Sequence, residues 1–102
     1  MMLAGMIKEV GKEVQEITLV NDAILFSKFV GGTPDILKLP IDRSISIMCN
    51  DNGKSLGLKP NFMLREYRDV ICGTALFVGN DGTGKFISLT KDQKETIKKY
   101  LQ

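Results

Sequence analysis

The chain has 102 residues, of which 43% are hydrophobic and 25% are charged, which is typical of a globular domain and excludes a disordered tail or a fibrous repeat. Its formal net charge of +2 does not predict nucleic-acid binding, and no apolar run approaches the roughly 18 residues of a membrane span. The sequence contains no histidine, which excludes histidine bases, catalytic triads and histidine-containing zinc sites.

The N-terminal segment predicts a β-hairpin. Apolar residues recur through residues 6–10 and 14–19, and Gly11 lies between the two runs. One helix through the whole segment is the alternative, but glycine inside a helix costs about 1 kcal/mol relative to alanine and costs little at a turn. We therefore expect two strands joined by a turn at Gly11 and Lys12.

A short helix is expected over residues 23–30. Asn21 and Asp22 offer an N-cap, and Gly31 and Gly32 provide the C-terminal stop. Apolar residues surround most of this helix, so a single sheet face cannot bury all of them. The exposed remainder predicts self-association as a homo-oligomer, with Phe26 or Phe29 contacting a second subunit.

The middle of the chain predicts further strands. Residues 36–39 are extended, and Pro40 limits them to the edge of a sheet. Residues 44–49 alternate as in a half-buried strand, and the Asn52-Gly53 turn after them predicts a hairpin with a short return strand at residues 56–58.

The second half of the chain predicts a surface loop with one helical turn over residues 59–69. Residues 70–78 follow as a central strand buried on both faces, and residues 86–89 as a strand after a glycine-rich turn. Thr90 then caps a final helix. In that helix Gln93 completes a capping box and Glu95 and Lys99 form an i,i+4 pair.

The order β-β-α-β-β-loop-β-β-α predicts an α+β fold with a mainly antiparallel sheet. We expect one domain over residues 1–102, in which Met6 is an alternative start that would make residues 1–5 an extension. Cys49 and Cys72 lie in apolar runs and are too few for a disulfide framework, so they are interpreted as inert core residues. The absence of a signal-peptide pattern favours the cytoplasm.

The segment from Gly79 to Lys85 matches the G-x-x-x-x-G-K pattern of phosphate-binding loops. Such a loop needs Ser or Thr next and a helix to follow, whereas Phe86 and a strand-like segment follow here. A nucleotide hydrolase is therefore rejected. The weaker alternative is that the turn and Lys85 contact an anion through backbone N–H groups.

A set of polar residues and glycines near the predicted turns forms the candidate ligand site. Arginine can bind phosphate bidentately, tyrosine can stack on a base, and asparagine can hydrogen-bond to ribose or base edges. Glycine in a buried strand marks a bulge, a close approach of another segment or the floor of a pocket. The candidate residues are Asn50, Asn61, Arg65, Tyr67, Arg68, Gly73 and Thr74.

Several blocks together resemble a family of small proteins of unknown function encoded by bacteria, phages and plasmids, mostly of Gram-positive hosts. The blocks are a strand ending in Asn50 with the Asp51–Lys54 turn, the Gly57–Asn61 segment, the Ile71–Thr74 strand and the Ser88–Thr90 helix entry. The resemblance covers roughly residue 6 to the C-terminus. It implies a mobile-element context, in which small proteins of this size often counter host defence.

The sequence favours a binding protein that carries out no chemistry and needs neither cofactor nor metal. By association with that context, we expect it to sequester a small anionic nucleotide-derived signal of host defence, in the cytoplasm of the host cell if it is phage-encoded. The competing class is a protein–protein interaction module that blocks or adapts a host enzyme, using the strand edge at residues 34–40. Neither a membrane nor nucleic acid is the expected partner.

Overall fold

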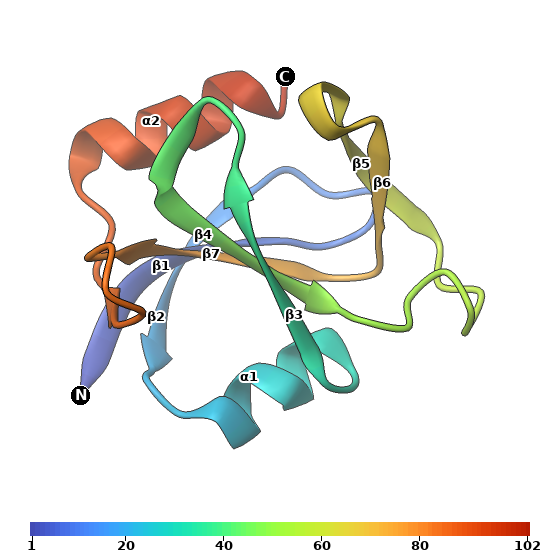
Figure 1. Ribbon diagram of the computed structural model, residues 1–102, viewed down its shortest axis with the longest axis horizontal. Helices are drawn as coiled ribbons and strands as arrows, with labels where there is room; N and C mark the ends of the chain where they lie inside the picture. Colours follow the sequence, from blue (N-terminus) through green and yellow to red (C-terminus); the bar gives the residue numbers. More distant parts are fainter.

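The computed structural model describes residues 1–102 and has the α+β fold class expected from the sequence (Figure 1). Its strands form one six-stranded antiparallel sheet and a separate two-stranded ribbon, and two α-helices pack against them. The elements are β1 (Met2–Lys8), β2 (Gln15–Val20), α1 (Ala23–Val30), β3 (Pro34–Leu39), β4 (Asp42–Asn50), β5 (Pro60–Leu64), the 3-10 turn η1 (Arg65–Tyr67), β6 (Asp69–Cys72), β7 (Ala75–Asn80), β8 (Phe86–Ile87) and α2 (Lys91–Tyr100).

The six-stranded sheet has the order β2-β1-β7-β4-β3, and β8 pairs with the far end of β7. The central strand β7 therefore lies between β1 and β4, which precede it by many residues (Figure 1). Ala75 and Phe77 face one side of the sheet, Leu76 and Val78 face the other, and none of these residues is exposed. The predicted burial of this strand on both faces is confirmed.

The two sheet faces are covered unequally, with α1 on one side and α2 and the β5–β6 ribbon on the other (Figure 1). The α2 side holds the larger core, which includes Met6, Ile45, Ile47, Phe77, Leu64, Ile97 and Tyr100. The α1 side holds a smaller cluster of Leu3, Leu19, Phe26, Met48, Leu76 and Val78. A helix of eight residues cannot cover one whole face of the six-stranded sheet, and cavities lie where α1 leaves that face uncovered.

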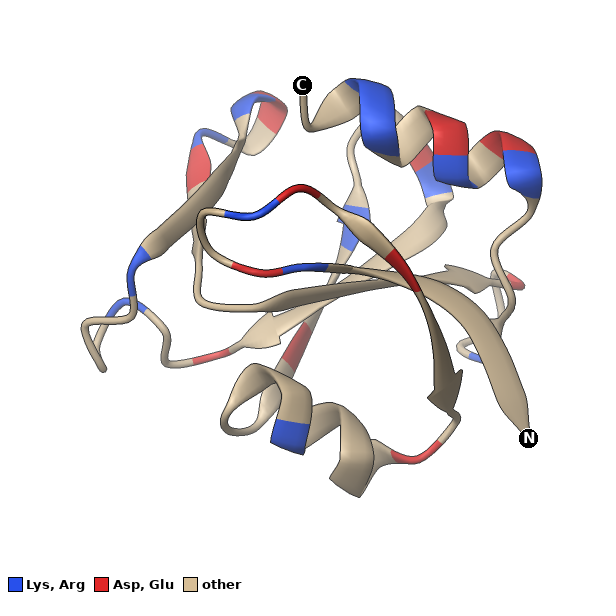
Figure 2. Ribbon diagram, turned by 180° about the vertical axis from the view of Figure 1, so that it is seen from behind, with Lys and Arg blue, Asp and Glu red and all other residues tan.

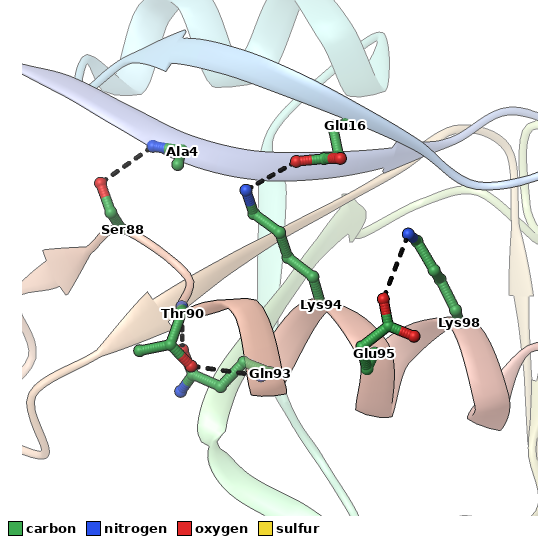
Figure 3. Close-up of polar contacts among 8 residues, drawn as sticks. All are labelled: Ala4, Glu16, Ser88, Thr90, Gln93, Lys94, Glu95 and Lys98. Atoms are coloured by element: carbon green, nitrogen blue, oxygen red, sulfur yellow. Dashed lines mark hydrogen bonds and ion pairs between the residues drawn. The ribbon is translucent and has the colours of Figure 1, made fainter.

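Both helices begin where the local sequence predicts, and α1 also ends where predicted. The Asp22 carboxylate accepts the Ile24 N–H at 2.8 Å at the start of α1, and Gly31 ends that helix with a φ of +76°. Thr90 and Gln93 form the predicted capping box of α2 (Figure 3). The predicted ion pair of Glu95 with Lys99 is wrong, because the Glu95 carboxylate lies 3.5 Å from Lys98 instead.

The N-terminal hairpin is also confirmed, and Gly11 has the positive φ of +75° that its turn requires. The strand β1 begins at Met2, ahead of the predicted residue 6, and Leu3 is part of the core. The start of β1 is held by Ser88, whose hydroxyl accepts the Ala4 N–H at 2.9 Å (Figure 3). Lys94 of α2 pairs with Glu16 of β2 at 2.7 Å across the same side of the sheet.

The stretch expected to form a single strand over residues 70–78 is two strands. Gly73 adopts a φ of +83°, a left-handed conformation, and the chain turns there from β6 in the ribbon to β7 in the sheet. The strand predicted at residues 44–49 exists, but it is buried on both faces, because α1 and the β5–β6 ribbon cover it from opposite sides.

The predicted surface loop over residues 59–69 is wrong in its first half. Residues 60–64 form β5, which pairs with β6, while the expected helical turn is η1. The predicted return strand at residues 56–58 does not form. Residues 51–57 form a wide turn that carries the chain from β4 to the ribbon, so Asn52 and Gly53 do not close a two-strand hairpin. The longest helix, α2, has ten residues, and no helix is long and apolar enough to span a membrane.

Candidate functional site

The largest indentation on the α1 face lies between the last turn of α1, the β1–β2 hairpin and the chain around Gly73. It consists of two adjoining cavities of about 440 and 510 Å³, which share Glu9, Phe29 and Thr74. We call this combined space the α1 hollow. Ligand sites in proteins commonly have volumes of roughly 300–1,000 Å³, so its size suits a small organic molecule.

Local backbone geometry places the groups that line the α1 hollow. Phe26 and Val30 face the sheet and are buried, and the helical period turns Phe29 sideways, where 41% of it is exposed. On the opposite wall, the left-handed conformation of Gly73 directs Thr74 to the same side of the sheet. An aromatic ring and a hydroxyl thus line one space from two distant segments.

Three lysines contribute the positive charge of the α1 hollow. Lys12 comes from the β1–β2 turn, Lys28 from α1 and Lys59 from the segment before β5. Lys28 and Lys59 have no ion-pair partner, whereas Lys12 lies 3.8 Å from Glu9. Lys28 is the one charged residue of α1, whereas charges of both signs alternate along α2 (Figure 2).

Two acidic residues lie in the segments around the α1 hollow, and both carboxylates are engaged. Glu16 is paired with Met6 in the β1–β2 ladder, so its side chain faces the α2 side of the sheet and only Glu9 contributes a carboxylate to the hollow. Glu9 is paired with Lys12, and Glu16 accepts a hydrogen bond from Lys94 at 2.7 Å. That hydrogen bond and the charge of Lys94 lower the pKa of Glu16. Glu16 therefore remains ionised and bound to a lysine, which is not the state of a general base that awaits a proton.

Of the candidate residues chosen from the sequence, Gly73 and Thr74 line the α1 hollow. Asn61 lies beside them, but its amide group holds the backbone. Its Nδ2 donates to the carbonyls of Lys8 and Gly73 at 2.7 and 2.8 Å, and its Oδ1 accepts from Lys8 Nζ at 2.9 Å. Asn61 thus supports the wall of the hollow from behind.

Asn50 is buried at the end of β4, where it also bonds to backbone. Its Nδ2 donates to the Val30 carbonyl at 3.2 Å, and its Oδ1 accepts the Asn52 N–H at 2.8 Å. Both bonds fix the turns that follow α1 and β4.

The remaining three candidates, Arg65, Tyr67 and Arg68, lie in and after η1 on the α2 side of the sheet. The Arg65 guanidinium lies 4.9 Å from the ring centre of Tyr100, and the Tyr67 hydroxyl donates to the Lys38 carbonyl at 3.0 Å. Arg68 ends the 3-10 turn with a left-handed φ of +51°. The structure therefore separates this trio from Gly73 and Thr74 by the thickness of the sheet.

The glycine-rich turn between β7 and β8 is already occupied by a carboxylate. Asp81 accepts the backbone N–H groups of Thr83 and Lys85 at 2.8 and 3.3 Å and the Thr83 hydroxyl at 2.7 Å. These hydrogen bonds lower the pKa of Asp81. Because the turn's donors are used by its own side chain, it is not available as a phosphate cradle, in line with the rejection of a nucleotide hydrolase.

The two cysteines line a different cavity of about 250 Å³ beneath the β5–β6 ribbon. Cys49 is 6% exposed, and burial, followed by the nearby carboxylates, raises the pKa of its thiol to about 11. A thiol with this pKa is a poor nucleophile at neutral pH, as expected for an inert core cysteine. Cys72 was also expected in the core, but it is only partly buried. No three cysteine or carboxylate side chains lie together as metal ligands.

Sequence reasoning missed the lysines of the α1 hollow and placed Phe29 only at an expected subunit contact. Lys12 follows a turn glycine and Lys28 precedes Phe29, but nothing local relates either of them to Lys59. The missing information is β5, because its pairing with β6 brings Lys59 to the chain around Gly73, where the Gly73 N–H donates to the Lys59 carbonyl.

The comparison with protein families gives one match, which covers nearly the whole chain. The model described as "Domain of unknown function (DUF3846)" matches residues 2–102, and the chain therefore belongs to this family. No curated protein and no solved structure matches the chain.

Proposed function

We propose that this member of the DUF3846 family is a binding protein that holds a small anionic ligand with an aromatic ring, such as a nucleotide-derived signal, in the α1 hollow. One observation carries the proposal. Phe29, which is 41% exposed, lines both cavities of the α1 hollow, and lysines from three separate segments line one cavity or the other. A ring can stack on a base, and lysines can pair with phosphate.

The same geometry favours binding over catalysis. Lys28 and Lys59 are free to pair with an anionic ligand. The Glu9 carboxylate is paired with Lys12, and the Glu16 carboxylate is paired with Lys94 on the α2 side of the sheet. The Cys49 thiol lies in the other cavity, under the β5–β6 ribbon. The residues around the ligand are thus suited to stacking, charge pairing and hydrogen bonding.

The biological setting of this proposal comes from the resemblance described above. A phage or plasmid protein that binds a nucleotide-derived signal without altering it would withdraw that signal from a host defence effector. This role requires high affinity and an abundant protein rather than turnover. The role against host defence is inferred from the mobile-element context of the resemblance, whereas the class of ligand is inferred from the residues of the α1 hollow.

Ligand retention tests the proposed function directly. The purified protein is heated to release bound small molecules, which are identified by mass spectrometry, and refolded protein is titrated with mononucleotides and cyclic dinucleotides by calorimetry. We expect saturable binding of at least one of them and recovery of the ligand unchanged. A chemically altered ligand contradicts binding without chemistry, and no binding of any member of the set contradicts the proposal.

Matched variants locate the site. Phe29→Ala should weaken binding by about fivefold or more, because stacking on one aromatic ring contributes about 1–3 kcal/mol. Ile24→Ala removes an exposed apolar side chain from the same helix outside the hollow and should leave affinity unchanged. Lys59→Gln should also weaken binding, whereas Lys91→Gln on α2 should not. If Phe29→Ala and Ile24→Ala weaken binding equally, or if Lys59→Gln and Lys91→Gln do, the ligand binds outside the α1 hollow.

A protein–protein interaction module is the second candidate, because β3 is an edge strand. Ile36 in this strand is 53% exposed, and the outer side of β3 has no partner strand. The free length is short, since Pro34 begins the strand, Pro40 follows it and its register shifts at Leu39. A stoichiometric complex with a host protein that is lost in Ile36→Pro, with the α1 hollow empty, would favour this candidate.

A further inference from the structure

A second cavity lies on the α1 face, on the opposite flank of the helix from the α1 hollow. It has a volume of about 180 Å³ and is bounded by β3, β4 and the β7–β8 turn. None of its lining residues lines the α1 hollow. We call it the Ser46 pocket, after the buried residue on its floor.

Ser46 is a polar residue in an apolar environment. It is 2% exposed in the middle of β4, and its neighbours on the same sheet face include Met48 and Val78. Its hydroxyl oxygen accepts a hydrogen bond from Asn80 Nδ2 at 2.9 Å, but its own proton has no acceptor in the protein. A serine hydroxyl can accept one hydrogen bond and donate another, so this hydroxyl can still donate to a ligand that brings an acceptor.

A lysine that forms no ion pair also lines this pocket. Lys38 of β3 is directly opposite Ser46 in the β3–β4 ladder, and paired residues of antiparallel strands face the same side of the sheet. Lys38 lines the same pocket and forms no ion pair. The pocket therefore combines a hydroxyl donor with a positive charge. Both groups can interact with the oxygen atoms of one anionic group.

Two other walls of the Ser46 pocket are the apolar side chains of Ile36 and Phe86, and Asn80, Gly82 and Gly84 complete the lining. Ile36 is 53% exposed, an unfavourable state for a large aliphatic side chain that a ligand could relieve. Phe86 is held in place by an edge-to-face contact with Phe26 of α1, with a ring-centre distance of 5.8 Å. The available volume is that of about six water molecules in the liquid, which limits the ligand to a few carbon atoms.

We propose that the Ser46 pocket binds a small carboxylate that carries a short apolar group. One carboxylate oxygen accepts the Ser46 hydroxyl proton, the charge pairs with Lys38, and the apolar group lies between Ile36 and Phe86. A phosphate ester of a nucleoside is too large for this volume. The proposal is independent of the function proposed for the α1 hollow, because the two sites share no residue.

The test uses the full chain and three probes of one shape. Isovalerate is the carboxylate, 3-methylbutan-1-ol is its neutral analogue and 3-methylbutan-1-amine is its cationic analogue at neutral pH. Titration is followed by the backbone amide resonances of an isotope-labelled sample. We expect isovalerate to shift the resonances of residues 36–38, 46 and 86 saturably, with little change at Phe29 and Thr74, and the other two probes to bind at least about tenfold more weakly.

Two variants separate the proposed contacts. Lys38→Gln should weaken isovalerate binding by about tenfold, and Ser46→Ala by severalfold or more, because each removes one contact to the carboxylate. Lys85→Gln neutralises an exposed lysine of the adjoining turn outside the pocket and serves as the control. Lys38 is on the surface, so its variant remains informative if Ser46→Ala does not fold. The proposal is overturned if no probe binds, if the alcohol or amine binds as well as isovalerate, or if Lys38→Gln and Lys85→Gln bind alike.

Discussion

Asn50 and Asn61 illustrate what a single side chain can do in this protein and what its sequence position conceals. Both were predicted to hydrogen-bond a ligand, and both instead use their amide groups on backbone atoms of other elements. Asparagine next to a turn is compatible with either role, since the amide has two donors and an acceptor. Only the tertiary position of residues such as Lys8 and Val30 decides between them, and that position is not encoded locally.

Gly73 is the residue on which the first mutational prediction rests. Its φ of +83° is unfavourable for any residue with a side chain, and a Cβ there would lie 2.8 Å from the Leu58 Cδ1. We expect Gly73→Val to lower the free energy of unfolding by about 2 kcal/mol or more and to weaken ligand retention in the α1 hollow, which it lines. Urea denaturation and calorimetry measure the two effects.

Gly57→Val is the matched control for this prediction. Gly57 has a similar φ of +72°, but a Cβ at this position would meet no atom within 4 Å. Gly57→Val should therefore lower the free energy of unfolding only by the backbone strain, and it should leave ligand binding unchanged. If Gly73→Val melts and binds as the wild type does, the glycine is incidental to both folding and the hollow.

At the scale of elements, the structures that the sequence predicts well are those whose signals are local. The capping residues Asp22 and Thr90 define the starts of α1 and α2, and both were identified from nearest neighbours along the chain. The strand β5 was missed, although Phe62 and Leu64 alternate as strand residues do. Pro60 and Asn61 suggested a loop, and β5 exists because β6 pairs with it.

The contact between Tyr100 of α2 and Glu66 of η1 predicts that the folded protein loses stability at alkaline pH. Burial, together with the hydrogen bond from its hydroxyl to Glu66 at 2.6 Å, raises the pKa of Tyr100 from 10.0 to about 12. A group whose pKa is higher in the folded state stabilises the protein fully below its unfolded pKa, and this contribution is lost as pH rises through the folded pKa. Stability should therefore fall between pH 10 and about pH 12.

Chemical denaturation across this pH range measures the effect. In Tyr100→Phe the ring remains but no proton can be lost, so the fall in unfolding free energy over this window should be smaller than in the wild type. Tyr67→Phe, which changes an exposed tyrosine of η1, is the control and should retain the wild-type pH profile. Identical profiles for the wild type and Tyr100→Phe would show that Tyr100 does not contribute to the transition.

At the scale of the whole molecule, the unequal cover of the sheet is the main feature that the sequence suggested only in part. The apolar run predicted as a central strand requires other elements to cover both faces of the sheet, and the two predicted helices are too few to cover both. The structure adds the β5–β6 ribbon on the α2 side and leaves hollows on the α1 side. Which face would be hollow could not be predicted, because it depends on where the ribbon packs.

The outer surface of α1 carries the prediction of a homo-oligomer. Of the two residues predicted at a subunit contact, Phe26 is 3% exposed and contacts Phe86, and Phe29 is exposed but lines the α1 hollow. The exposed side chain of α1 outside the hollow is Ile24, which is 69% exposed and can contact a second subunit while the hollow stays open. Light scattering should find a dimer at micromolar concentration, because such patches favour association. Ile24→Asp should yield a folded monomer, whereas Ile41→Asp, at an exposed isoleucine before β4, should not. A monomeric wild type contradicts this prediction.

The central position of β7 has a consequence for synthesis on the ribosome. Met6 of β1 and Ile47 of β4 both pair with Phe77, so the middle of the sheet cannot close until the chain beyond Asn80 has left the exit tunnel. Until then β1 and β4 each present an unpaired apolar edge, the kind of edge that promotes aggregation of nascent chains. Pairings between such distant segments also slow folding, so most of the sheet should assemble after translation rather than during it.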